Sequence, residues 1–268
     1  MGTTVAKLGS GDRLLDGQHV TMRIARYLRR LRLARYKKAV ASGYDAAASH
    51  YDDWVWQALW RKTEWPQLRS VLLAPRPPRQ VLEIGIGTGA IARHILEEIP
   101  DVIRYVGIDV SRGMLAECEN LHLGPRVVLI NDDVISVDFG RLGGSFDFVL
   151  SCRMIGHLQT LGEMFAKVRQ VLATDGQFVV TDIDPGHNYV ATRLPTDDGR
   201  IEVPTFKHRP EDVIAAAEQA GLRLDRLYRT YEDEALANAG AEAPASLTGR
   251  TGPLFNLFVF RPGPAVSA

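Results

Sequence analysis

Short apolar runs alternate with amphipathic segments through the middle of the chain, between residues 80 and 184. Each run is nine residues or shorter and ends in glycines or acidic residues, as is typical of strands covered on both faces of a sheet. Strands that alternate with helices predict a parallel, doubly wound, Rossmann-like α/β sheet. Strands are expected over residues 81–86, 105–110, 126–133, 146–152 and 176–184, and helices over 89–99, 111–123 and 163–173.

The C-terminal part departs from this alternation. A polar segment over residues 184–208 leads into an Ala-rich helix that Gly221 ends. Two more strands are expected, over residues 222–231 and 253–262, with no helix between them. Such a pair predicts an antiparallel hairpin at the edge of the sheet. Ligands are expected at the carboxyl ends of the parallel strands.

The N-terminal segment is strongly basic. Residues 1–40 hold ten Lys and Arg and two Asp, although the whole chain has zero net charge. Leu and Ile recur at helical spacing among the arginines of residues 22–38, which predicts a basic amphipathic helix. This helix could be a solvated arm, pack on the domain or a second copy in a homodimer, or bind an anionic peptide, nucleic acid or membrane surface. Nucleic acid is disfavoured, because no RNA-binding motif of recognised spacing accompanies it.

A second N-terminal segment is rich in aromatic residues. Trp54, Trp56 and Trp60 lie within seven residues of one another, in a segment that predicts a helical cap. The tryptophans could contact an aromatic substrate or belong to helices that cover one sheet face. The segment APRPPR then breaks any helix. We therefore divide the chain into a basic arm (1–42), a helical cap (43–75) and a cofactor-binding domain (76–268).

Length and composition favour one enzyme-sized domain. The chain has 268 residues, of which 46% are hydrophobic and 24% charged, and this excludes a disordered or fibrous protein. Cys118 and Cys152 are too few for a disulfide framework, so a reducing compartment is expected. No signal-peptide or membrane-span pattern is present, which predicts a cytoplasmic protein without a membrane partner. No metal site is predicted.

A glycine-rich turn follows the first predicted strand. Gly85, Gly87 and Gly89 lie in the sequence VLEIGIGTGA, between that strand and its helix. Glycines let the backbone turn sharply and approach a ligand closely, and the helix N-terminus attracts negative charge. The pattern also satisfies the dinucleotide fingerprint through Ala90, so the turn alone does not separate the two cofactor types.

Acidic residues at three successive strand ends distinguish between the two cofactor types. Glu83 would repel a pyrophosphate and hold an ammonium group. Asp109, at the end of the second strand, suits ribose hydroxyls. The third strand ends in Asn-Asp-Asp-Val over residues 131–134, which offers a carboxylate to an adenine amino group. These acids favour an adenosyl amino acid over a dinucleotide.

The segments VLEIGIGTG, GIDVSRGML, INDDV and SFDFVLSCRMIGHL resemble, in order and spacing, the class I S-adenosylmethionine-dependent methyltransferases. The resemblance covers about residues 80–185 and implies a seven-stranded, mostly parallel sheet with an antiparallel last strand. It also implies a tyrosine that closes over the methionine carboxylate, for which Tyr51 is the first choice and Tyr44 the second. Carried over by position, it assigns Glu83, Gly85, Gly87, Gly89, Ser151 and Cys152 to the methionine part of the cofactor, Asp109 to the ribose, and Met114, Asp132, Asp133 and Val134 to the adenine, with the choice between the two aspartates open. Val110 is also expected to bind the cofactor.

Three histidines are candidate general bases, because an imidazole suits proton removal near neutrality. His157 follows the fourth strand and is the first candidate, and His187 follows the fifth strand. His208 lies beside Lys207 and could face an anionic group. Each could instead be a packing or loop residue. Arg153 could pair with a substrate carboxylate or cap the strand end, and ranks below the histidines.

The expected function is methyl transfer from S-adenosylmethionine to an O, N or C atom of a small molecule. The Ala-, Arg- and Gly-rich composition favours a specialised metabolite as that molecule. An alternative is a peptide methyltransferase whose basic arm holds an acidic leader. A nicotinamide oxidoreductase would need a Tyr-x-x-x-Lys pair, and the nearest match, Tyr189 with Arg193, ends in arginine. A nucleic-acid-binding module is the non-enzyme alternative.

Overall fold

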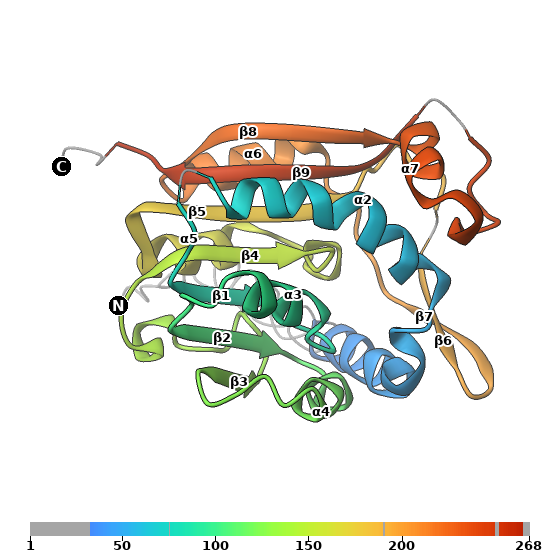
Figure 1. Cartoon of the computed structure of the whole chain (residues 1–268), viewed down its shortest axis with the longest axis horizontal. Coiled ribbons are helices and arrows are strands. Elements are labelled where there is room, and N and C mark those ends of the chain that lie inside the picture. The colour runs from blue at the N-terminus through green and yellow to red at the C-terminus, as the bar shows by residue number, and fades with distance from the viewer. Residues whose placement is uncertain (1–32, 75, 190, 250–251, 265–268) are drawn as a thin grey trace, which may run out of the picture.

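A computed structural model describes residues 33–74, 76–189, 191–249 and 252–264. Within these ranges seven strands form one sheet in the order β3-β2-β1-β4-β5-β9-β8 (Figure 1). The first five strands are parallel, and β9 is antiparallel to both of its neighbours. The predicted fold class is confirmed. The strands are β1 (Gln80–Ile84), β2 (Arg104–Asp109), β3 (Val127–Asn131), β4 (Phe146–Cys152), β5 (Leu172–Ile183), β8 (Leu222–Tyr231) and β9 (Pro253–Pro262).

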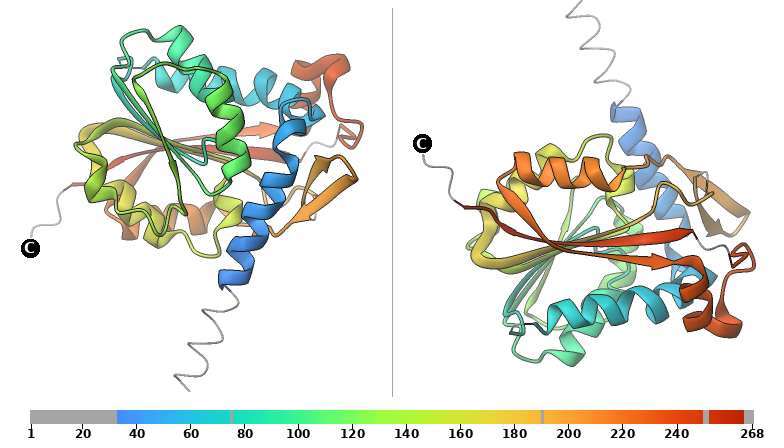
Figure 2. Two further views of the ribbon diagram at one scale, coloured as in Figure 1. Left: turned by 90° about the horizontal axis from the view of Figure 1, so that it is seen from below. Right: turned by 90° about the horizontal axis from the view of Figure 1, so that it is seen from above.

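Helices cover both faces of the sheet (Figure 2). One core packs the sheet against α5, α6 and the short helix η1, and the other packs it against α2, α3 and α4. Alternate residues of β1 enter the two cores, so Leu82 and Ile84 lie in the first and Val81 in the second. The helices are α2 (Val55–Leu72), α3 (Ala90–Glu98), α4 (Arg112–Asn120), α5 (Gly162–Val171), α6 (Pro210–Gln219), α7 (Glu232–Ala239), η1 (Phe139–Leu142), η2 (Ile155–His157) and η3 (Gly240–Glu242).

The connection between β8 and β9 corrects one expectation. It contains the helix α7, where none was predicted. Glu232, Asp233 and Glu234 occupy the first turn of α7, and acidic side chains there stabilise the helix N-terminus. The surrounding Ala- and Gly-rich composition had indicated only a loop. The two strands still pair antiparallel at the edge of the sheet.

The polar segment after β5 also contains regular structure. β6 (Thr192–Thr196) and β7 (Gly199–Val203) pair antiparallel as a separate two-stranded sheet. Leu194 and Val203 are fully buried against Val40 and Ala47 of the N-terminal helix. This hairpin is therefore packed against the N-terminal part of the chain.

The N-terminal helix occupies residues 33–51 and is continuous across residue 42, where the sequence analysis divides arm from cap. Most of the predicted basic helix, residues 22–32, lies outside the described residues. The Thr88 hydroxyl donates to Asp52 just beyond the helix (2.7 Å), and the Ser111 hydroxyl donates to Asp45 (2.6 Å). These bonds fix the helix beside the carboxyl ends of β1 and β2 (Figure 1).

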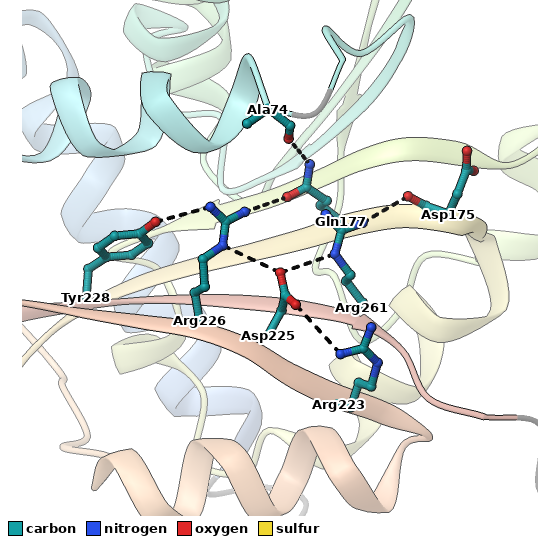
Figure 3. Close-up of polar contacts among 8 residues, drawn as sticks. All are labelled: Ala74, Asp175, Gln177, Arg223, Asp225, Arg226, Tyr228 and Arg261. Carbon is teal, nitrogen blue, oxygen red and sulfur yellow. Dashed lines mark hydrogen bonds and ion pairs between the residues drawn. The ribbon is translucent and has the colours of Figure 1, made fainter.

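Charged side chains cover the edge strand β8 near its start (Figure 3). Asp225 is paired with Arg223 (3.6 Å), Arg226 (3.5 Å) and Arg261 (3.2 Å). Arg226 also donates to the amide oxygen of Gln177 of β5, which pairs with Phe148 of β4. Such charges disfavour pairing with another chain at this edge. The network lies toward the amino ends of the parallel strands, away from the ligand-binding end.

Candidate cofactor and acceptor site

A cavity of about 220 Å³ opens at the carboxyl ends of the parallel strands. Ligands bind sheets of this kind at this end. The residues around it come from the N-terminal helix, the ends of β1 to β4, and the segment from η2 to the start of α5. They are Leu33, Tyr36, Lys37, Val40, Tyr44, Tyr51, Ile84, Gly85, Gly87, Ile108, Asp109, Val110, Met114, Asp132, Asp133, Val134, Ile135, Cys152, Arg153, Met154, His157, Leu158, Gln159, Thr160 and Glu163.

The glycine turn forms one wall of the cavity. Gly85 and Gly87 have φ angles of 81° and 57°, in the left-handed region that favours glycine. A Cβ on Gly87 would meet nothing within 4 Å, so its backbone is open to a ligand. Gly89 has a different role, because a Cβ there would lie 2.5 Å from Sγ of Cys118. It permits α3 and α4 to pack closely and does not line the cavity.

Asp109 crosses the mouth of the glycine turn. Its carboxylate accepts hydrogen bonds from the backbone N–H of Gly87 (2.8 Å) and of Ser111 (2.9 Å). Burial raises the pKa of Asp109 to about 6, against the lowering effect of these bonds. Each carboxylate oxygen has a second lone pair, so Asp109 could still accept from a pair of ribose hydroxyls.

Both aspartates after β3 line the cavity. Asp133 is partly buried, accepts from the backbone N–H of Ile135 (2.9 Å) and forms an ion pair with Lys37 of the N-terminal helix. Asp132 is exposed and accepts from the backbone N–H of Asp133 (2.7 Å). Val134 is buried next to them and offers an apolar wall that could contact an adenine ring.

Glu83 is not among the residues that line the cavity. It lies on the face of β1 toward α2 and α3, is 1% exposed and accepts a hydrogen bond from the Tyr105 hydroxyl. Burial raises the pKa of Glu83 to about 8. The ammonium-binding role that the sequence suggested therefore has no direct geometric support. Ser151 is also buried outside the cavity, whereas the next residue, Cys152, lines it.

His157 lies on the cavity wall in a defined tautomer. Its Nδ1 is 2.9 Å from the carbonyl oxygen of Pro204, which can only accept, so Nδ1 carries the proton. Nε2 is then the acceptor, and the Tyr44 hydroxyl donates to it at 2.8 Å. Burial lowers the pKa of His157, partly offset by the bond to Pro204. The imidazole is consequently neutral at neutral pH, and its unprotonated Nε2 faces Tyr44.

The other two histidines lie outside the cavity. His208 donates from Nε2 to the carbonyls of Ile155 (3.2 Å) and Leu158 (2.8 Å), and so holds η2 in place. His187 is buried, and its Nε2 lies 4.0 Å from the carboxylate of Glu232. The structure thus brings one of the three candidate histidines to the cavity.

The predicted pair of tyrosines meets at the same wall. The rings of Tyr44 and Tyr51 are 6.0 Å apart, and both line the cavity. Burial raises the pKa of Tyr51, and the nearby Arg153 charge offsets part of this rise. Burial also raises the pKa of Tyr44, so both hydroxyls are protonated at neutral pH, and that of Tyr44 donates to His157.

Arg153 has a more specific environment than the sequence indicated. Its φ of 56° is unusual for a residue with a side chain and costs about 1–3 kcal/mol. Its backbone N–H donates to the carbonyl of Thr181 (2.8 Å), and Nε lies 3.0 Å from the carboxylate of Glu64. The guanidinium also lies 5.1 Å from the ring centre of Trp60. The sequence could not reveal this arrangement, because α2 contributes both partners.

Besides the predicted Tyr44, the N-terminal helix supplies four cavity residues that the sequence did not single out. Leu33, Tyr36, Lys37, Val40 and Tyr44 all line the cavity. They recur three or four residues apart, which places them on one helix face. That spacing was the available signal, although it was hidden within a strongly basic segment.

Among the described residues, no group of His, Cys, Asp and Glu is placed to hold a metal ion. No helix in the same part of the chain is long and apolar enough to cross a membrane.

Comparisons with known proteins agree with the fold and the glycine turn. The family described as a methyltransferase domain matches residues 81–176. The chain is 30% identical over 210 residues to malonyl-(acyl-carrier protein) O-methyltransferase of Geobacter sulfurreducens. The aligned region spans 74% of this chain and 75% of that protein. It is 28% identical over 169 residues to a reducing polyketide synthase of a Penicillium species, of which it spans only 7%.

Solved structures share the architecture at lower identity. A complex of DhpI with S-adenosylhomocysteine has a TM-score of 0.59 and 21% identity, and the match covers 85% of this chain and 98% of that one. The CcbJ methyltransferase of Streptomyces caelestis has a TM-score of 0.58 and 19% identity, over 84% of this chain and 99% of that one. At these identities the likeness shows the fold alone.

The fold and the relatives together define an S-adenosylmethionine-dependent methyltransferase of class I. The chain belongs to this family, and it is an enzyme whose cofactor is S-adenosylmethionine. The expectations of family, enzyme class and cofactor are confirmed.

Proposed function

We propose that this enzyme methylates a metabolite-sized acceptor that carries a removable proton, with His157 as the proton acceptor. The observation that carries the proposal is the unprotonated Nε2 of a neutral imidazole on the cavity wall, which accepts a hydrogen bond from the Tyr44 hydroxyl at 2.8 Å. The acceptor atom would be an oxygen or nitrogen of a small molecule, and the name of the Geobacter relative, an O-methyltransferase, supports oxygen. A specialised metabolite remains our proposed substrate class.

The cofactor would lie along the strand ends. We propose that Asp109 holds the ribose hydroxyls, that Asp133 and Val134 hold the adenine, and that Gly85 and Gly87 admit the methionine part. The left-handed backbone at Gly87 and the open space beside it support this placement. The bound cofactor supplies an electrophilic methyl group on a sulfonium.

The protein's own contribution is orientation, dehydration and proton removal. The partly buried rings of Tyr44 and Tyr51 would keep water from this part of the cavity wall, and alignment of the acceptor lowers the entropy cost of the reaction. A hydroxyl or amine that displaces Tyr44 from Nε2 would give its proton to His157. The Pro204 carbonyl holds the ring in the competent tautomer and stabilises the imidazolium that forms.

Transfer of labelled methyl groups tests the proposal. Purified enzyme with labelled S-adenosylmethionine would be screened against a panel of hydroxy acids, phenols, amines and malonyl thioesters. Methylated product is expected from at least one class, with a large loss of rate in His157→Gln and wild-type affinity for S-adenosylhomocysteine. Full turnover by His157→Gln would contradict the role of the imidazole.

A further inference from the structure

Arg153 is a partly buried cation on the cavity wall that the proposed chemistry does not use. Its side chain is 17% exposed, and its contact with Glu64 is made through Nε. Among the described residues, its two terminal nitrogens make no hydrogen bond, and Nε, although paired with Glu64, has none of good geometry. A guanidinium has five N–H donors, and the terminal pair matches the two oxygens of a carboxylate.

Two elements, β5 and α2, fix the position of Arg153. Thr181 of β5 accepts from the backbone N–H of Arg153 through both its carbonyl (2.8 Å) and its hydroxyl (3.2 Å). Glu64 and Trp60 of α2 hold the side chain from the other side. The Thr181 hydroxyl in turn donates to Glu64, so the counter-ion is itself anchored. Several contacts therefore restrict the guanidinium together, and its position does not depend on any one of them.

The backbone of Arg153 gives a second, independent observation. Its φ of 56° lies in the left-handed region, where side-chain-bearing residues are uncommon. Strained residues persist where the surrounding structure holds them, and they cluster at ligand sites. The left-handed turn directly after β4 is what brings this side chain to the cavity instead of the sheet face.

A purely structural role explains these features less well. An ion pair between Arg153 and Glu64 buries two charges, and such pairs add little stability over an apolar pair of similar size. Here Arg153 lies beside Tyr44 and Tyr51 on the cavity wall, whereas Glu64 does not line the cavity, and the guanidinium keeps N–H donors that no described residue uses. An unused, fixed pair of N–H donors is suited to an anionic ligand.

We infer that Arg153 binds a carboxylate of the acceptor, and that Glu64 positions it. The inference rests on the proposed function, because it deepens the same site: the acceptor is a small acid whose carboxylate contacts Arg153 while its hydroxyl or amine lies at Tyr44 and His157. The Arg153 charge selects acids over neutral analogues, and the carboxylate fixes the distance from the reacting atom to the base.

Equilibrium binding tests this inference without turnover. Protein loaded with S-adenosylhomocysteine would be titrated with lactate, mandelate and salicylate, each against its primary amide. The wild type should bind at least one acid more tightly than its amide, by about tenfold or more. Absence of any such preference in the wild type overturns the inference, whereas failure of the proposed function would appear separately, as no methyl transfer to any acceptor.

Two variants separate anion binding from structural support. Glu64→Gln keeps the shape but removes the counter-ion, so affinity for the acid should rise. The double variant Arg153→Met with Glu64→Gln leaves no buried charge unpaired, which keeps the fold, and its preference for acid over amide should fall to about one. Retention of the preference in the double variant overturns the inference.

The cofactor also carries a carboxylate, and two nucleosides distinguish that source. S-adenosylhomocysteine has the amino acid moiety, and methylthioadenosine lacks it. The double variant should bind both with wild-type affinity. A loss confined to S-adenosylhomocysteine would assign Arg153 to the cofactor and overturn its role toward the acceptor.

Discussion

Nζ of Lys37 forms an ion pair with the carboxylate of Asp133, and so joins the N-terminal helix to the end of β3. The pair lies over the part of the cavity that we assign to the adenine. An adenine amino group and the Lys37 ammonium would therefore compete for the same carboxylate. The helix that covers the cofactor cavity therefore also neutralises Asp133, one of the residues that we assign to cofactor binding.

Lys37→Met tests this competition. The variant should bind S-adenosylhomocysteine more tightly, by up to about fivefold, since partly exposed ion pairs contribute at most about 1 kcal/mol. The salt dependence of binding should weaken as well. Titration calorimetry at two ionic strengths measures both effects, and Lys38→Met, on an exposed position of the same helix, is the control. Weaker binding by Lys37→Met would mean that Lys37 itself holds the cofactor.

Asp109→Asn should weaken binding of S-adenosylhomocysteine by about 10- to 100-fold, because it removes a charged hydrogen-bond acceptor. The amide oxygen can still accept from one of the two N–H groups, so the turn should keep its shape. Calorimetry gives the affinity and circular dichroism checks the fold. Unchanged affinity would show that the ribose does not contact this carboxylate.

The pH dependence of methyl transfer should report the imidazole of His157. Its pKa is lowered by burial, so the neutral base persists below the ordinary value of about 6.5. We expect kcat/KM to stay level from neutral pH down to that value and to fall as the pH drops through the lowered pKa. His157→Gln should lose this dependence along with about 100-fold in rate. His208→Gln, altered outside the cavity, should keep the wild-type profile.

Glu83 should make stability depend on pH. Its pKa is raised to about 8 by burial, whereas in the unfolded chain it is about 4.3. The protonated form is favoured by folding, so its contribution is fully present below about pH 4.3 and is lost as the pH rises through about 8. Glu83→Gln should flatten this decline, with a gain of about 3–5 kcal/mol at pH 8 relative to the wild-type trend. Urea unfolding at several pH values measures it, and parallel declines in both proteins would contradict the raised pKa.

The sequence was most informative where local patterns decide the structure. The five parallel strands and the glycine turn follow from short apolar runs and from the need for left-handed glycines. The helix α7 was missed because the acids of its first turn, such as Glu232, lie beside Ala- and Gly-rich residues that also suit a loop. Arg153 was underestimated for another reason, since Glu64 is far away in sequence and no periodicity connects them.

Glu83 shows a limit of motif reasoning. Its position next to the glycines suggested a ligand for the cofactor, but side chains alternate along a strand and Glu83 points to the face opposite Ile84. His157 was selected correctly as a residue near the cavity, yet its two partners come from segments far away in the chain. Periodicity predicts the face of an element, whereas tertiary packing decides which faces meet.

The carbonyl oxygen of Pro204 accepts from both the Tyr36 hydroxyl (3.1 Å) and His157 (2.9 Å). This single oxygen, just after the β6–β7 hairpin, thereby connects the N-terminal helix to the imidazole. If the N-terminal helix swings aside to admit ligands, Tyr36 leaves this oxygen and Tyr44 leaves the ring. The bond from Nδ1 of His157 to Pro204 does not involve that helix, so the imidazole would keep its tautomer while Nε2 becomes accessible to an acceptor.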